Sequence, residues 1–254
     1  MSLFEFALGP LEAVEPWGTP PNLSLHWFGL SDGTYHIDLG ATRLLEYANR
    51  DGWPHFVEYQ LARIHEDILA MLSDVLEPIP SSVARHFVDG RLGSTLRHLR
   101  EKWEASEDAD SSLDAALEAL GNRHLDTAYL SPSAGIWIWN DDLKTVIEWD
   151  NRDRLVDGRP AWTSAFGRHE LAREEFVEEV RAFHLRLTAA MDERVQQVCS
   201  KWTRPEVRID LERLAAEQIE RSGAFDSAVH RGCRATDWRT VQMALSRTAT
   251  AGPA

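Results

Sequence analysis

The 254-residue chain contains only two cysteines, Cys199 and Cys233. These are too few for a disulfide framework and, without clustered histidines, for a zinc site. No run approaches the roughly 18 apolar residues of a membrane span. The first residues include acids and prolines but no basic segment followed by an apolar stretch, so a secretory signal is not expected. These absences predict a cytoplasmic protein that does not bind a membrane.

Basic residues are scarce relative to acidic ones. Lys and Arg number 27 against 41 Asp and Glu, which gives a formal net charge of −14. Because affinity for nucleic-acid backbones comes from clustered Lys and Arg, this balance argues against direct nucleic-acid binding. A basic protein partner is the expected counterpart of such a chain.

The motifs of the common enzyme classes are also missing. The sequence has no G-x-G-x-x-G or Walker loop, no G-x-S-x-G turn and no H-E-x-x-H zinc motif. No Glu-x-x-His pair occurs, which argues against a di-iron bundle. We therefore expect no metal and no cofactor. Catalysis stays open, but the pattern favours a protein without it.

What is present is a strong helical pattern in a chain that is 43% hydrophobic and can bury a core. Apolar residues at spacings of three and four predict a long amphipathic helix from about His169 to Trp202. A similar stripe predicts a helix over residues 55–77, which Pro78 ends. We expect these two helices to pack against each other in antiparallel orientation.

Two β-hairpins are predicted. Residues 23–40 are expected to turn at a three-residue loop that ends at Gly33, which pairs His26 with Asp38 across the strands. A short helix over residues 42–50 is expected to follow.

The second predicted hairpin spans residues 134–150, with its loop at residues 141–144. This register pairs Trp139 with Val146 and gives the hairpin one purely apolar face. The other face mixes aromatic and acidic side chains: Trp137, Trp139, Val146, Glu148 and Asp150.

The sequence thus predicts an α+β fold, in which two antiparallel β-hairpins form one sheet packed against long amphipathic helices. Further helices are expected over residues 81–103, with an interruption near Gly90 and Gly93, from Ser111 to Leu120 after a capping box of Ser111 and Asp114, and over residues 205–221. We expect one domain over residues 1–220. An Arg-rich, partly frayed C-terminal segment over residues 221–254 follows it.

Three groups of residues are candidate sites. The first is a polar cluster of His26, His36 and Asp38, in which a carboxylate could orient an imidazole as a general base. The alternative is a cross-strand pair on a solvated face.

The second group is a partner-binding surface around the second hairpin, formed by Trp137, Trp139, Glu148, Asp150 and Arg152. Trp and Arg are typical of binding hot spots. The alternative is that a helix covers this face, both tryptophans belong to the core and the charged residues form surface ion pairs.

The third group is the acidic start of the long helix, where Glu174, Glu175 and Glu178 are candidate contacts for the basic partner. The alternative is that these carboxylates only stabilise the helix dipole.

Four segments taken together resemble a bacterial family of unknown function that is frequent in actinobacteria: LHWFGLSDGTYHIDLG, IWIWNDDLKTVIEWDNRD, DGRPAWTS and EEVRAFHLRLTAAMDERV. The resemblance spans most of the chain and implies no catalytic residue. In its small size, acidity and tryptophan content, the chain is also similar in style to immunity proteins of bacterial polymorphic toxin systems.

The function expected from these observations is a cytoplasmic protein-binding module, of the immunity-inhibitor type, that docks a basic partner through its acidic, Trp-containing surface. The alternative is an enzyme of unrecognised type with a cleft of His and carboxylate residues between sheet and helices.

Overall fold

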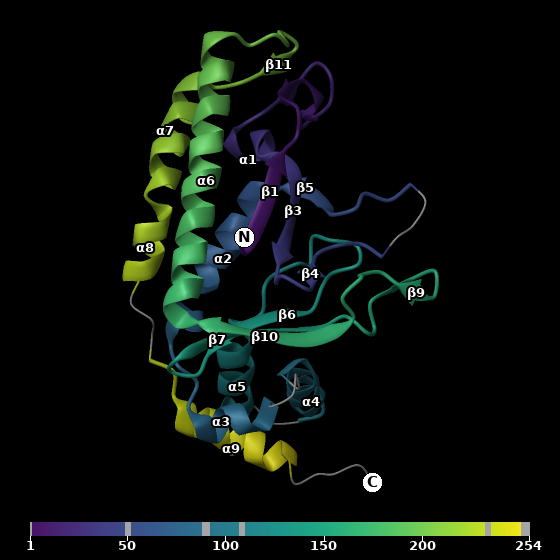
Figure 1. The fold of residues 1–254 in the computed structure, drawn as a ribbon, viewed down its shortest axis with the longest axis vertical. Helices are drawn as coiled ribbons and strands as arrows, with labels where there is room; N and C mark the ends of the chain where they lie inside the picture. Colours follow the sequence, from purple (N-terminus) through teal and green to yellow (C-terminus); the bar gives the residue numbers. More distant parts are fainter. Residues whose placement is uncertain (1, 49–51, 88–91, 107–109, 232–234, 250–254) are drawn as a thin grey trace. The chain divides into compact units, whose positions relative to one another are not determined.

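A computed structural model describes residues 2–48, 52–87, 92–106, 110–231 and 235–249 of the chain (Figure 1). The chain forms two compact units, each built from two separate segments. Unit 1 comprises residues 1–70 and 177–230, and unit 2 comprises residues 71–176 and 231–254. Antiparallel sheets pack with helices, so the predicted α+β class is confirmed. The expected boundary at residue 220 stays a prediction.

The sheet of unit 1 is built around β3 (Asp32–Asp38). This strand pairs antiparallel with β1 (Phe4–Leu8), β4 (Arg43–Leu44) and β5 (Val57–Gln60). Its side chains alternate between buried and half-buried positions, as a strand with one covered face requires. β1 lies so close to Gly33 that a Cβ there would stand 2.3 Å from the Ala7 carbonyl oxygen.

The predicted hairpin over residues 23–40 is wrong. Strand β2 (Leu23–Ser24) pairs with β11 (Val207–Arg208) instead, and α1 (Trp27–Leu30) is a short helix that buries Trp27 and Leu30. Gly33 lies inside β3 because β1 approaches it, and not in a turn. The helix expected over residues 42–50 is also wrong up to residue 48, since β4 lies there and Leu45 has a φ of 64°. Residues 49–50 lie outside the described part.

The helices of unit 1 include α6 (Arg173–Ser200), which confirms the predicted long helix. Its apolar stripe from Phe176 to Val198 is buried. The helix starts later than expected because residues 169–172 belong to a strand. Helix α7 (Leu211–Ser222) runs beside α6, and Gln218 of α7 donates to the Thr188 carbonyl at 3.0 Å (Figure 1).

Three further helical segments complete this unit: η1 (Leu11–Ala13), α8 (Ala224–His230) and the first part of α2 (Leu61–Leu76). The predicted helix over residues 55–77 therefore exists, but its first residues form β5. Its expected packing on the long helix is supported by His65, whose ring lies 5.8 Å from that of Phe183.

The sheet of unit 2 confirms the second predicted hairpin. Strands β6 (Ile136–Asn140) and β7 (Lys144–Asp150) pair in the expected register, with Trp139 opposite Val146. A third strand, β10 (Phe166–Ala172), pairs with β7 and was not expected. The first predicted hairpin does not share this sheet, because β3 and its partners form a separate one. A small ribbon of β8 (Leu155–Val156) and β9 (Arg159–Pro160) leads into β10.

Helices lie on one side of this sheet: α3 (Ser81–Ala84), η2 (Arg85–Phe87), α4 (Leu92–Glu104) and α5 (Ser111–Gly121), with α9 (Trp238–Ala249) packed on α3, α4 and α5 (Figure 1). Of the interruption expected near Gly90 and Gly93, Gly90 lies outside the described residues, and Gly93 is inside α4, so the helix continues through that position. The cap of α5 is Asp110, which accepts from the Ser112 amide at 2.9 Å, and not the predicted Ser111.

Helix α9 belongs to the segment expected to be Arg-rich and partly frayed. Val241, Ala244 and Leu245 on this helix are fully buried in the core of unit 2. Before the helix, the amide and hydroxyl of Thr236 donate to Glu77, which also pairs with the fully buried Arg123 at 3.1 Å. The chain around residue 236 is thus anchored by a buried ion pair, while residues 250–254 lie outside the described part.

Among the described residues, no helix is both long and apolar enough to cross a membrane.

Candidate functional site

The aromatic and acidic face of the β6–β7 hairpin lies under helices. Trp137, Trp139 and Glu148 are 9%, 3% and 1% exposed, and both tryptophans belong to the core cluster of unit 2. The Phe87 ring packs edge-on against Trp139 at 5.3 Å. Arg168 on β10 lies over Trp139 and within 3.6 Å of the Glu148 carboxylate. Of the two alternatives for this face, the buried one is therefore correct, and Trp139 and Glu148 are inaccessible to a partner.

The edge of the Trp137 ring lies against two glycines. A Cβ on Gly93 would stand 2.5 Å from the Trp137 ring, and a Cβ on Gly135 would stand 3.0 Å from it. Only glycine leaves α4 and the start of β6 close enough to enclose the indole. The Trp137 side chain also lies at the end of a cavity.

This cavity, which we name the α4–α5 groove, has a volume of about 640 Å³. Helix α4 lines it with residues at helical spacing: Gly93, Leu96, Arg97, Arg100, Trp103 and Glu104. Helix α5 contributes Asp114, Leu117 and Gly121, and the rest of the lining is His124, Trp137, Asp150, Asp153 and Arg154. The groove therefore combines an apolar floor with many charged groups.

Most of the carboxylates in the groove already have partners. Asp153 pairs with Arg97 at 3.1 Å, and Asp114 accepts from the Trp103 indole at 2.7 Å. Asp150 accepts two hydrogen bonds from Arg152, at 2.9 and 2.8 Å, and these bonds hold the pKa of its carboxyl below the usual value. Of the expected partner-binding residues, Trp137 and Asp150 line the groove.

Arg152 itself is exposed beside the groove. Its guanidinium group lies 4.3 Å from the centre of the Phe166 ring, which is also exposed. The stacking on this ring and the two hydrogen bonds to Asp150 fix the direction of the Arg152 side chain.

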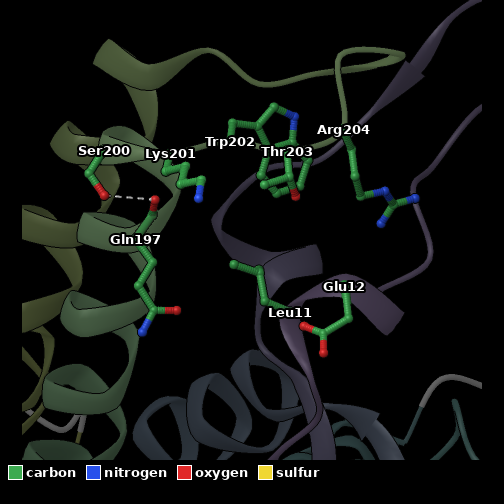
Figure 2. A pocket seen from close by; sticks show the side chains of 8 residues that line it. All are labelled: Leu11, Glu12, Gln197, Ser200, Lys201, Trp202, Thr203 and Arg204. Atoms are coloured by element: carbon green, nitrogen blue, oxygen red, sulfur yellow. Dashed lines mark hydrogen bonds between the residues drawn. The ribbon is translucent and has the colours of Figure 1, made fainter.

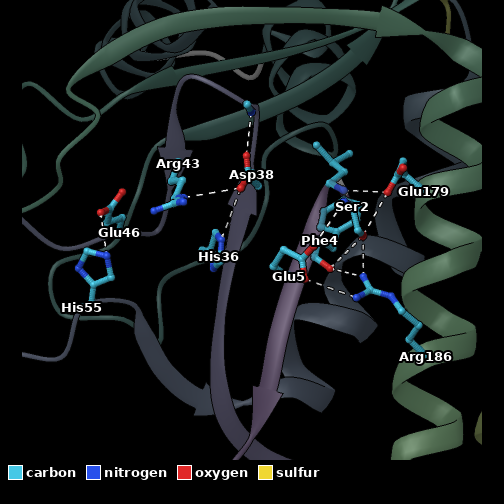
Figure 3. A network of polar contacts seen from close by, with 12 residues as sticks. Ser2, Phe4, Glu5, His36, Asp38, Arg43, Glu46, His55, Glu179 and Arg186 are labelled. Carbon is cyan, nitrogen blue, oxygen red and sulfur yellow. Dashed lines mark hydrogen bonds and ion pairs between the residues drawn. The ribbon is translucent and has the colours of Figure 1, made fainter.

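The third group, Glu174, Glu175 and Glu178, is exposed on α6 and does not line the groove. The neighbouring Glu179 differs, because its carboxylate accepts from the Leu3 amide at 2.8 Å (Figure 3). Exposure is a requirement for the docking role expected of these three glutamates.

The polar cluster of the first predicted hairpin is only partly formed. His36 and Asp38 are neighbours on β3, with Nε2 and Oδ2 4.0 Å apart, and Arg43 lies 3.6 Å from the same carboxylate (Figure 3). A separation of 4.0 Å is too long for a hydrogen bond, so Asp38 does not fix the orientation of the imidazole. His36 instead stacks on Phe56, with ring centres 4.0 Å apart, and its pKa is lowered by burial.

His26 is not part of this cluster. It stands directly before α1, where its ring packs edge-on against Trp17 at 4.5 Å. The cross-strand pair of His26 with Asp38 does not form, because Arg43 is the residue opposite Asp38.

Another titratable pair, His65 and His184, is buried in unit 1. His184 Nε2 donates to the Ser222 carbonyl, and its Nδ1 lies 3.0 Å from His65 Nε2, which must then carry the shared proton. Burial lowers the pKa of His65 to about 3, with His184 and Arg221 acting in the same direction. Both imidazoles are therefore neutral at pH 7.

A second cavity, of about 410 Å³, lies at the C-terminal end of α6 in unit 1. It is lined by Leu11, Glu12, Gln197, Ser200, Lys201, Trp202, Thr203 and Arg204 (Figure 2). The Arg204 side chain donates to the Val14 carbonyl, and the Trp202 indole donates to the Val207 carbonyl, so both side chains connect parts of the fold.

The lining from α4 and α5 is what sequence reasoning missed. The signal was the helical spacing of Arg97, Arg100 and Glu104 on one side of α4, opposite the buried Leu92 and Leu99. That spacing predicts a shared face, but only the packed fold brings this face to Trp137.

Fold and site together define a two-unit α+β protein with a mixed-charge groove and, in the described part of the chain, no cluster of His, Cys, Asp and Glu that could hold a metal ion. The chain belongs to DUF5984, a family of unknown function, whose model matches residues 3–244. Comparison with curated proteins and with solved structures finds no significant match.

Proposed function

We propose that this chain is a protein-binding module and that the α4–α5 groove receives a segment of its partner. The observation that carries the proposal is the lining itself, in which two tryptophans and three arginines surround a cavity of about 640 Å³. Trp and Arg dominate the binding energy of protein interfaces, and a groove along two helices is a common way to take up a peptide segment.

The partner is proposed to be basic overall. The net charge of −14 and the exposed Glu174, Glu175 and Glu178 favour its approach by electrostatic steering. The finer form of this proposal is a cytoplasmic, bacterial inhibitor of the immunity type. It rests on the acidity of the chain, its tryptophan content and the missing catalytic motifs.

Capture from a lysate of the native host tests the proposal. The immobilised chain is compared with Trp103→Ala in the groove and with Trp17→Ala outside it, a matched control because the two side chains are 47% and 46% exposed. We expect a protein that the unchanged chain and Trp17→Ala retain and that Trp103→Ala loses by about tenfold or more. Higher salt should weaken its capture.

Two results would contradict the proposal. One is the recovery of no protein at either low or high salt. The other is equal capture by Trp103→Ala and Trp17→Ala, which would place the binding surface outside the groove.

A further inference from the structure

Two arginines of the α4–α5 groove, Arg100 and Arg154, differ from Arg97 in making no ion pair among the described residues. Arg97 is paired with Asp153, and Asp150 with Arg152. Arg100 and Arg154 have no carboxylate within 4 Å among the described residues. The groove thus holds two guanidinium groups that no ion pair engages, although its lining as a whole also carries Glu104, Asp114, Asp150 and Asp153.

Both arginines lie near His124. Burial lowers the pKa of His124, and the charges of Arg154 and Arg100 lower it further, while Asp126 acts in the opposite direction. The imidazole packs on the Trp137 ring at 5.1 Å and is neutral at pH 7. A neutral imidazole can donate one hydrogen bond.

The groove also holds an unpaired carboxylate. Glu104, one turn beyond Arg100 on α4, has no cation within 4 Å among the described residues, and the Trp103 indole donates to Asp114. What singles out Arg100 and Arg154 is therefore that both act on His124, which packs on Trp137.

We propose that the part of the groove around His124 is an oxyanion site, in which Arg100 and Arg154 bind a carboxylate or phosphate group and His124 is the third contact. Guanidinium groups bind both oxyanions with charge-assisted hydrogen bonds. Leu96, Leu117 and Trp137 supply an apolar wall for the body that carries the anion. The inference rests on the proposed function only in using the same groove, and it names the group that the groove recognises.

The test is an NMR titration of the His124 imidazole in the full chain, in millimolar sodium phosphate, sodium benzoate or sodium chloride at equal ionic strength. A bound oxyanion stabilises the imidazolium form, so phosphate or benzoate should raise the pKa of His124 by about one unit relative to chloride.

Three variants make the result specific. The double variant Arg100→Ala/Arg154→Ala should lose the anion-dependent shift, and Arg100→Lys/Arg154→Lys should keep part of it because the charge remains. Arg239→Ala, an exposed arginine on α9 outside the groove, should keep all of it. The inference is overturned if neither anion shifts the pKa, or if the double alanine variant shows the same shift.

The source of the anion is decided in the same preparation. If the oxyanion belongs to the partner, added benzoate or phosphate should compete with it and release the captured protein. If the natural ligand is a separate small anion, the captured protein should stay bound when benzoate or phosphate is added. A negative titration would contradict the oxyanion site without affecting the capture comparison with Trp103→Ala. A negative capture comparison would contradict the protein-binding function without affecting the titration, so the two proposals can fail separately.

Discussion

At the scale of single residues, the groove depends on Gly93. A Cβ at this position would meet the Trp137 ring at 2.5 Å, and Gly135 approaches the same edge of this ring, where a Cβ would stand 3.0 Å from it. Gly93→Ala should therefore destabilise the protein by about 1–3 kcal/mol, measured as the free energy of unfolding in urea.

Gly121→Ala is the matched control. Gly121 also lines the groove at the end of α5, but no atom lies within 4 Å of its added Cβ. Because alanine favours a helix more than glycine, this variant should keep or raise stability by about 0.5–1 kcal/mol. Equal losses in the two variants would show that the contact with Trp137 is not what requires glycine at position 93.

At the scale of elements, the burial of His65 of α2, next to His184 of α6, makes stability depend on pH. The pKa of His65 is about 3 in the folded protein, against 6.5 for the free side chain, so the unfolded chain binds more protons between these values. The contribution of the neutral, buried His65 to stability is complete above about pH 6.5 and is lost as the pH falls toward 3. His65 should account for about 2 kcal/mol of the loss between about pH 7 and 5.

His65→Phe tests this prediction by urea unfolding at the two pH values. The variant should show a smaller fall in stability than the unchanged chain, whatever its absolute stability. His98→Phe removes an exposed imidazole and should leave the fall as it is. An unchanged pH dependence in His65→Phe would mean that other groups cause it.

The same scale explains which elements the sequence could predict. The register of β6 and β7 was predictable because the alternation and the loop lie within 17 consecutive residues, 134–150. The position of Gly33 inside a strand was not predictable, because its pairing partner β1 comes from residues 4–8. Strand β2 was not predictable either, because two residues are too short to show a period. β10 was missed for a related reason, since residues 169–172 also fit the helical stripe of α6.

The candidate site was predictable only in part. Trp137 and Asp150 were chosen from one strand pair, and both line the groove. Trp139 shares their face but lies in the core against Phe87 of η2. A hairpin alone does not reveal which part of its face a helix covers. Arg100 and Arg154 come from distant segments, and no local pattern connects them.

At the scale of the whole molecule, charge should govern the rate of association. Reversing Glu174, Glu175 and Glu178 to Lys should lower the association rate constant of the captured partner by about tenfold at low salt and less at high salt. Reversing the exposed Glu206, Glu212 and Glu220 changes the net charge equally and is the control. Surface plasmon resonance measures both, and equal rates for the two triple variants would exclude a docking role for the start of α6.

The assembly of each unit from two segments also has a consequence for biosynthesis. Unit 2 interrupts unit 1, and the chain passes between them after Ala70, after Phe176 and after His230. A ribosome that has made the first 70 residues has therefore synthesised β1 and β3 without α6, whose Phe183 packs against Phe4 and Phe6 of β1. Unit 2 in turn waits for α9. Neither unit is complete in an N-terminal fragment of the chain, so the last contacts of each core form only after its C-terminal segment has been synthesised.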